Sequence, residues 1–190
     1  MSILTAGVTS TGEREITLPA SDVLYEEVEG RRVELPPIGS YAGYISTRLL
    51  GLLFGLVEGR RLGFLTVETL FVLDAAKGLK RRPDIAFVSH ERWPEDKPIP
   101  RVGVWDVIPD LAVEVISPND LDIEVMGKLH EYFQHGVRRV WQVRPSEGTV
   151  YIYNSPTSVT IHDRSETIDC GSILGNVRLA LGSVFRDAES

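Results

Sequence analysis

The sequence predicts an α/β fold, and three of its patterns carry that prediction. Apolar residues recur at helical spacing over 40–58 and again over 121–135. Between these segments lie three short apolar runs typical of buried strands, and a fourth run follows the second segment. The expected order is therefore helix, three strands, helix, strand, with further β elements at both ends of the chain.

The N-terminal part is expected to be loose before it becomes regular. Residues 1–15 are polar with little periodicity, so we expect a flexible N-terminus followed by one domain over 16–190. Residues 16–35 are predicted to form one or two short strands around a turn near Glu29-Gly30, and the two prolines that follow stop regular structure.

The first helix is expected over 40–58, with Ser40 as its N-terminal cap and Gly59 as its stop. Three glycines inside it each cost about 1 kcal/mol relative to alanine. Their presence indicates close packing against a sheet or a second subunit. The apolar stretch is interrupted by glycines and is shorter than the roughly 20 residues that cross a membrane. We therefore expect a core helix and no membrane partner.

The remaining elements follow from short apolar runs and their turn residues. We expect strands at 63–73, 84–88, 111–116 and 139–143, a helix at 121–135 closed by Gly136, and a hairpin at 150–153 and 159–162. A long proline-rich loop over 89–110 carries Trp93 and Trp105. These tryptophans either pin the loop to the core, form a lid or dimer contact, or stack on exposed bases.

The composition excludes several functional classes. Cys170 is the only cysteine, so an internal disulfide is impossible and a reducing, cytoplasmic setting is expected. The four histidines have no partner at zinc-ligand spacing, and no glycine-rich phosphate loop is present. A net charge of −7 argues against a protein that coats nucleic acid. Short basic clusters at 31–32, 60–61 and 80–82 still allow local contact.

Glu114 is the most informative residue, because it is the one charged side chain in the apolar run LAVEVI. Side chains alternate faces along a strand, so Glu114 shares a face with Ala112 and Ile116. A buried carboxylate without a partner is strongly unfavourable. The fold has to supply either a water-filled cleft or a salt bridge to a core arginine or lysine.

Asp84 raises the same question, because it follows Pro83 at the start of a predicted strand. It is either a strand-start residue that hydrogen-bonds a turn or a second functional carboxylate. If the strands at 84–88 and 111–116 are neighbours, Asp84 and Glu114 converge at one end of the sheet. Two adjacent carboxylates repel, and hard oxygen ligands with open positions suit Mg²⁺. The pair therefore predicts a metal site for phosphodiester hydrolysis.

Lys128 is the third candidate. At about 100° per residue it lies on the rim of the apolar face of the second helix, so its ammonium can extend toward the end of the sheet. There it could position the attacking water or stabilise a phosphate oxygen. The alternative is an exposed pair with Glu124 one turn earlier, worth only ~0.2–0.5 kcal/mol.

These residues resemble the PD-(D/E)XK signature of restriction-endonuclease-like nucleases, with Pro83-Asp84 upstream of Glu114. The wider pattern is similar to the Uma-type family of bacterial restriction endonucleases. The matching segments are YEEVEGRRVELPP at 25–37, RRPDIAFVSHERWP at 81–94, PDLAVEVISPND at 109–120, KLHEYFQHGVRRVWQV at 128–143, VYIYNSP at 150–156 and LGNVRLALGSVF near the end. The resemblance covers most of the chain from about Leu24 onward.

The resemblance implies an αβββαβ core with a mixed central sheet, additional N- and C-terminal strands, Mg²⁺- or Mn²⁺-dependent cleavage of DNA, and a homodimer. By position, Asp84 and Glu114 would be the metal carboxylates and the backbone carbonyl of Val115 a further ligand. The signature places a lysine two residues after the glutamate, where this chain has Ile116. The lysine role is therefore assigned to Lys128.

A second departure from the family concerns the third side-chain ligand. Many relatives carry a histidine near the start of the first helix, where this chain has Ala42. Another acid then has to complete the site. The candidates are Glu34 or Glu26, with Glu68, alone in the apolar run TVETLFVL, as a substitute.

The predicted function is a Mg²⁺-dependent endonuclease that hydrolyses phosphodiester bonds in DNA with Asp84, Glu114 and Lys128. One alternative is a catalytically inactive nuclease-fold module that binds a protein or nucleic-acid partner. The residue at 116, the missing histidine and the acidic charge favour that alternative. A phosphodiesterase with a small substrate is the third possibility.

Overall fold

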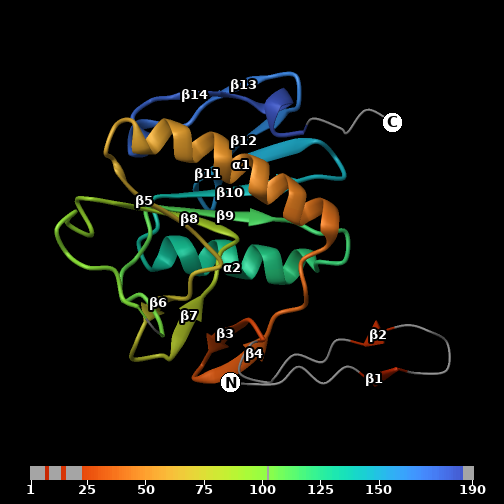
Figure 1. The fold of residues 1–190 in the computed structure, drawn as a ribbon, viewed down its shortest axis with the longest axis vertical. Helices are drawn as coiled ribbons and strands as arrows, with labels where there is room; N and C mark the ends of the chain where they lie inside the picture. Colours follow the sequence, from red (N-terminus) through yellow and green to blue (C-terminus); the bar gives the residue numbers. More distant parts are fainter. Residues whose placement is uncertain (1–6, 9–13, 16–22, 102, 186–190) are drawn as a thin grey trace.

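The fold centres on a six-stranded mixed sheet between two helices, in a computed structural model that describes residues 7–8, 14–15, 23–101 and 103–185. The strand order is β12-β11-β10-β9-β8-β5. The bounds are β5 Gly63–Val67, β8 Ile85–Ser89, β9 Leu111–Val115, β10 Arg139–Arg144, β11 Thr149–Ser155 and β12 Ser158–Asp163. The sheet is seen edge-on between α1 (Ser40–Glu58) and α2 (Asp122–Gln134) in Figure 1.

The connectivity confirms the predicted αβββαβ core, which runs α1, β5, β8, β9, α2, β10. The strands β9 and β10 are parallel, whereas the other neighbouring pairs in this sheet are antiparallel. A parallel pair needs a crossover connection, and α2 supplies it on one face of the sheet. This crossover places the start of α2 beside the end of β9.

A second, four-stranded sheet lies on the α2 side of the molecule (Figure 1). Its order is β4-β3-β7-β6, with β3 Tyr25–Val28, β4 Arg31–Glu34, β6 Phe71–Asp74 and β7 Leu79–Arg81. The hairpin of β3 and β4 turns at Glu29 and Gly30, whose φ angles are 52° and 73°. The predicted turn at this position is therefore confirmed.

The prediction of one strand over 63–73 is wrong. The chain leaves the central sheet after β5, turns at Glu68 with a φ of 46°, and enters the small sheet as β6. Both halves of the run are apolar because both pack into hydrophobic layers: β5 contributes Leu65 on the α1 side and Phe64 on the α2 side, and β6 contributes Phe71 and Leu73 on the α2 side. The strand β7 was not predicted, because its sequence Leu-Lys-Arg carries one apolar residue.

The bounds of the other predicted helices and strands agree closely with the structure, but the N-terminal cap of α1 differs from the prediction. The helix α1 begins at Ser40, but Gly39 occupies the N-cap position and makes no side-chain hydrogen bond, so the capping role predicted for Ser40 is wrong. The hairpin of β11 and β12 is present as predicted. The flexible N-terminus predicted over 1–15 lies largely outside the described residues, of which Gly7–Val8 (β1) pairs with Arg14–Glu15 (β2).

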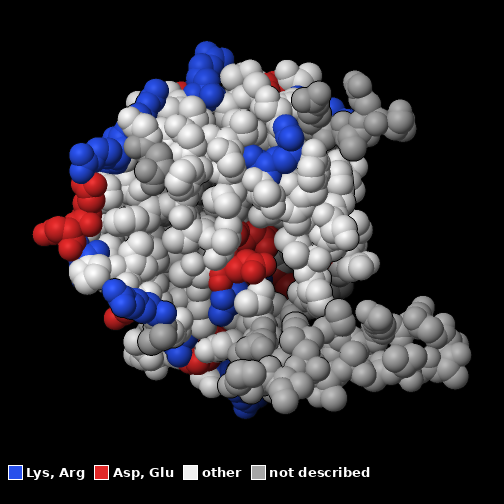
Figure 2. All heavy atoms as spheres, viewed as in Figure 1, with Lys and Arg blue, Asp and Glu red and all other residues white. Residues whose placement is uncertain are grey.

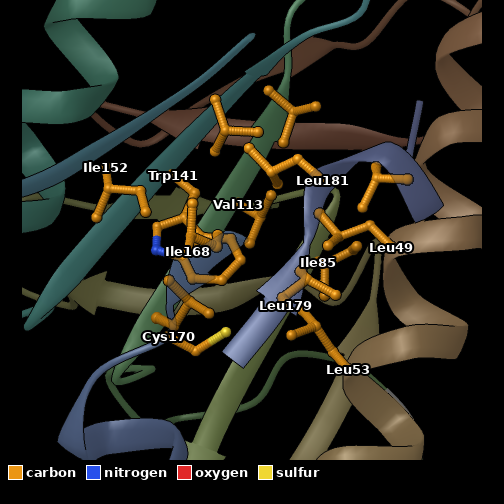
Figure 3. Close-up of a cluster of buried hydrophobic side chains, with 14 of the residues drawn as sticks. Leu49, Leu53, Ile85, Val113, Trp141, Ile152, Ile168, Cys170, Leu179 and Leu181 are labelled. Atoms are coloured by element: carbon orange, nitrogen blue, oxygen red, sulfur yellow. The ribbon is translucent and has the colours of Figure 1, made fainter. Parts of the chain in front are cut away.

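Two hydrophobic layers pack against the two faces of the central sheet. On one face, α1 contributes Ile45, Leu49, Leu53 and Val57, and the C-terminal strands β13 (Thr167–Asp169) and β14 (Arg178–Ala180) pack beside it. Figure 3 shows Leu49 and Leu53 of α1 next to Leu179 and Ile85 in this layer. Within the described part of the chain, α1 is the one helix that is long and apolar enough to cross a membrane, a test that core helices also pass.

The other face is covered by α2, the small sheet and the long loop. Trp105 is 2% exposed, stacks on Phe71 and meets the edge of Trp93, which is also buried. The backbone of Trp105 also exchanges hydrogen bonds with Leu70 and Val72. Both tryptophans therefore pin the loop 89–110 to the core, as one of the sequence interpretations expected.

Candidate active site

A cleft of about 350 Å³ opens where β8 begins and β9 ends. One wall is the segment 35–39 together with Ala42 of α1, and the other is α2 with Lys128. Asp84, Glu114 and Val115 form part of its lining between these walls. In the space-filling view of Figure 2, acidic side chains gather in a hollow near the centre of the face, and basic side chains lie directly beside them.

The strand register brings Asp84 opposite Glu114. Ile85 of β8 pairs with Val113 of β9 in an antiparallel ladder, so the next position beyond this pair joins residues 84 and 114. Opposed residues project to the same face of a sheet. The two carboxylates predicted from sequence are thus neighbours, on the face that α2 covers.

Asp84 is fastened to the end of β9 by a backbone hydrogen bond. The N–H of Val115 donates to Oδ2 of Asp84 at 2.6 Å. Asp84 does lie at the start of a strand, but its carboxylate accepts this bond from the last residue of β9 and not from a turn. The same bond also fixes the carboxylate at the cleft, so the structural and functional interpretations are compatible.

Glu114 is held by a tyrosine and not by a cation. The hydroxyl of Tyr132, which is fully buried on α2, donates to Oε1 of Glu114 at 2.6 Å. Among the described residues, no arginine or lysine forms a salt bridge with Glu114. The alternative interpretation, in which Glu114 forms a salt bridge with a core arginine or lysine, is therefore not what the structure shows.

The environment disfavours the charged form of both carboxylates. Burial raises the pKa of Asp84 to about 6, against the opposing effects of the Val115 N–H and the Lys128 ammonium. Burial likewise raises the pKa of Glu114 to about 7; Lys128 opposes the rise, whereas the neighbouring Asp84 adds to it. A cation bound between these two groups would remove this cost of ionisation.

Lys128 lines the cleft, and its ammonium pairs with an acid on the small sheet. Its Nζ lies 3.2 Å from Oε1 of Glu26, and the alternative pair with Glu124 is not formed. Burial alone would lower the pKa of Lys128, but the carboxylates of Glu114 and Glu26 outweigh it and raise that pKa. Lys128 is thus a cation beside the carboxylate pair.

The three acids considered as a further metal ligand lie outside the cleft lining. Glu34 is exposed on β4, so the geometry gives its predicted ligand role no support. Glu26 is 1% exposed and is occupied by cationic partners. Glu68 contributes its backbone to the turn, where its N–H donates to the carbonyl of Asp84 at 3.2 Å. Ala42 and Ile116, the two departures from the family pattern, both line the cleft.

The donor set at the cleft suits a hydrated Mg²⁺ ion. Among the described residues, no group of three or more His, Cys, Asp or Glu side chains could hold a metal. Mg²⁺ retains several waters and is commonly held by one or two carboxylates, which Asp84 and Glu114 supply. The N–H and C=O of a strand residue point to the same side, so the carbonyl of Val115 lies on the Asp84 side as a further oxygen donor.

Sequence reasoning missed two residues that shape this site. Tyr132 lies on the buried face of α2, and a buried hydroxyl normally requires a partner, so its position was the available signal. Arg82 lines the cleft and donates from Nε to the carbonyl of Tyr25 at 3.0 Å. Its place at the cleft depends on the pairing of the small sheet, which no local pattern in the sequence indicates.

Comparisons with known proteins agree with the fold. The model of the Uma2 family, described as "Putative restriction endonuclease", matches residues 14–182. A crystal structure from Anabaena variabilis ATCC 29413, described as "a putative nuclease belonging to DUF820", superposes with a TM-score of 0.75 at 20% sequence identity. The superposition covers 89% of this chain and 93% of that chain, and at this identity it shows a shared fold alone. Comparison with curated proteins gave no match.

Proposed function

The chain belongs to the Uma2 family of restriction-endonuclease-like proteins, and from this premise we propose that it is a Mg²⁺- or Mn²⁺-dependent endonuclease that hydrolyses DNA. The observation that carries the proposal is the placement of Asp84 opposite Glu114 in a cleft, where burial raises the pKa of both carboxyl groups. Perturbed titratable groups that converge in a cleft are typical of functional sites.

The proposed division of roles follows from the position of each group. Asp84, Glu114 and the carbonyl of Val115 would hold the divalent cation. When bound, that cation would supply Lewis-acid stabilisation of charge on the phosphate. The ammonium of Lys128 stands at the α2 wall, where it can stabilise a phosphate oxygen or orient the attacking water. Tyr132 keeps the Glu114 carboxylate in one orientation.

Plasmid nicking tests the proposal directly. Purified protein should nick supercoiled DNA with Mg²⁺ or Mn²⁺ and lose this activity in chelator. Asp84→Asn and Glu114→Gln should each abolish nicking, because each removes a ligand charge while preserving shape. The matched control is Glu124→Gln, since Glu124 also lines the cleft but lies on the exposed side of α2. Nicking that survives in both ligand variants would reject the site.

Three finer features of the proposal do not rest on the geometry: the substrate and the assembly follow from the family resemblance, and the location follows from the single cysteine. We propose DNA as the substrate, a homodimer as the assembly and the cytoplasm as the location. The assembly is tested by light scattering on the purified chain. The nucleic-acid class is tested by offering duplex DNA, single-stranded DNA and RNA at equal nucleotide concentration, with cleavage of DNA as the expected result.

A second candidate function is a nuclease-fold module that has lost catalysis and binds a partner. The observation that favours it is Ile116 in the usual lysine place, together with the finding that no group of three or more His, Cys, Asp or Glu side chains among the described residues could hold a metal. Calorimetry with Mn²⁺ separates the two functions. The endonuclease should bind Mn²⁺ with heat that Glu114→Gln removes, whereas the inactive module should give none.

A further inference from the structure

We propose that Glu26 is the residue that positions Lys128 in the cleft, an inference that rests on the proposed function of this site. Sequence reasoning considered Glu26 as a possible metal ligand. The contacts of its carboxylate assign it a different role, as the fixed partner of the cation that works beside the metal-binding carboxylates.

Both oxygens of the Glu26 carboxylate are already occupied by protein donors. Oε1 lies 3.2 Å from Nζ of Lys128 and accepts the backbone N–H of Arg82 at 3.0 Å. Oε2 accepts NH1 of Arg81 at 2.6 Å. With 1% of its surface exposed, Glu26 has no room for a metal ion and its waters. A buried carboxylate with this many charge-assisted hydrogen bonds is rigidly held.

The contacts of Glu26 with Arg81 and Lys128, here called the clamp, extend from the small sheet to α2. Arg81 of β7, which holds Glu26, also binds Oε2 of Glu131 through Nε and NH2, each at 2.6 Å. Glu131 follows Lys128 by three residues on α2, so both side chains project from neighbouring positions of one helix face. Two points of α2 are thus tied to one buried arginine–glutamate pair, which fixes the helix and the lysine together.

The clamp also decides which carboxylate the Lys128 ammonium pairs with. The carboxylates that attract the Lys128 ammonium are Glu26 and Glu114. If Glu26 did not hold it, the ammonium would be drawn to Glu114 and would neutralise the carboxylate that binds the cation. The Glu26 contact keeps the ammonium at the cleft wall, so Glu114 remains available and Lys128 stays within reach of a phosphate.

Lysine NMR tests this role without requiring activity. The chain contains four lysines, so ¹⁵N labelling at lysine gives few ammonium signals, and Lys128→Met assigns the one of interest. In the wild type that signal should be observable because a buried, paired ammonium exchanges slowly with water. Glu26→Gln should broaden or shift it. The matched control is Glu27→Gln, which breaks the 2.7 Å pair with Lys80 on the adjacent, outward-facing position and should leave the Lys128 signal unchanged.

Two further measurements complete the test. Mn²⁺ affinity should fall in Glu26→Gln, because the released ammonium competes at Glu114, and it should be restored when Lys128→Met is added, because Glu26 is not itself a ligand. Turnover should fall by about 100-fold, the cost expected for a misplaced catalytic group. Lys128→Met combined with Glu26→Gln should be no slower than Lys128→Met alone. Should Glu26→Gln fail to fold, Glu26→Asp keeps the charge beside Arg81 while withdrawing the carboxylate from Lys128, and the same signal is followed.

The outcomes separate this inference from the proposed function. An unchanged Lys128 signal in the Glu26 variants, or a loss of Mn²⁺ affinity in Glu26→Gln that Lys128→Met does not restore, would overturn the positioning role. A wild-type protein that nicks no DNA, but whose Lys128 signal depends on Glu26, would overturn the endonuclease proposal and support the positioning role.

Discussion

The N–H of Val115 donates a hydrogen bond to Oδ2 of Asp84 at 2.6 Å, and this bond joins the start of β8 to the end of β9. One residue earlier on β9, Glu114 faces the same cleft. The bond therefore sets the separation of two acids that would otherwise repel. The site is assembled by the sheet before any ligand enters, which is the condition for a preorganised metal centre.

Neutral isosteres of the two acids should stabilise the metal-free protein while destroying metal binding. At about pH 8 both carboxylates are charged in an environment that disfavours charge. Asp84→Asn or Glu114→Gln should raise Tm by roughly 2–4 °C, the shift that about 1 kcal/mol gives in a chain of this size. Differential scanning fluorimetry with and without Mg²⁺ measures this. A lower Tm in both variants would show that the charges are well compensated within the fold.

The stability of the metal-free protein should decrease as pH rises from about 4 to about 7. The folded-state pKa values of Asp84 and Glu114, about 6 and about 7, exceed their ordinary values of 3.8 and 4.5. The folded state therefore binds more protons than the unfolded state in this window, and raising the pH favours unfolding. This destabilising contribution should be absent from the Asp84→Asn, Glu114→Gln double variant.

Added Mg²⁺ should reverse that trend at the upper end of the window. Metal ligands have to be ionised, and protons compete with the metal below their pKa. The increase in Tm that Mg²⁺ gives should be small near pH 5 and complete above about pH 8. An increase of equal size at both ends would place the cation on other groups.

Tyr132→Phe should weaken metal binding without removing a ligand. The Tyr132 hydroxyl donates to Glu114 at 2.6 Å, and this bond lowers the pKa of Glu114. Its loss should raise that pKa and lower Mg²⁺ affinity by about 10-fold, as loss of a ligand's hydrogen-bond partner commonly does. The control is Tyr153→Phe, which removes the hydroxyl of a buried residue on β11 outside the cleft lining. Equal affinities in the two variants would contradict the orienting role.

The sequence predicted the central sheet and the carboxylate pair well, because both depend on local patterns. A charge within an apolar run, as at Glu114, is visible without any structure. The turn at Glu68 was not visible, because that residue adopts a positive φ without being glycine. The pairing of Lys128 with Glu26 could not be predicted from local patterns either. Glu26 and Arg81 are 55 positions apart and meet only through the pairing of β3 with β7, a strand with almost no apolar signature.

A lysine returned to position 116 should compensate for the loss of Lys128. Ile116 lines the cleft and lies two residues beyond Glu114, on the same face of the strand's extension. Lys128→Met should lower turnover by about 100-fold or more, the usual cost of removing one group that stabilises developing charge. Adding Ile116→Lys to that variant should restore part of the loss, roughly 10-fold, because the ammonium returns to the cleft beside the phosphate site.

The control for this rescue is Ile38→Lys in the same Lys128→Met background. Ile38 also lines the cleft but lies on the wall formed by the segment before α1, and it is 44% exposed. A lysine there adds the same charge to the cleft at a different place. If Ile38→Lys restored as much turnover as Ile116→Lys, the effect would be general attraction of nucleic acid to the cleft. Recovery confined to Ile116→Lys would show that the position beside Glu114 can still serve the catalytic lysine.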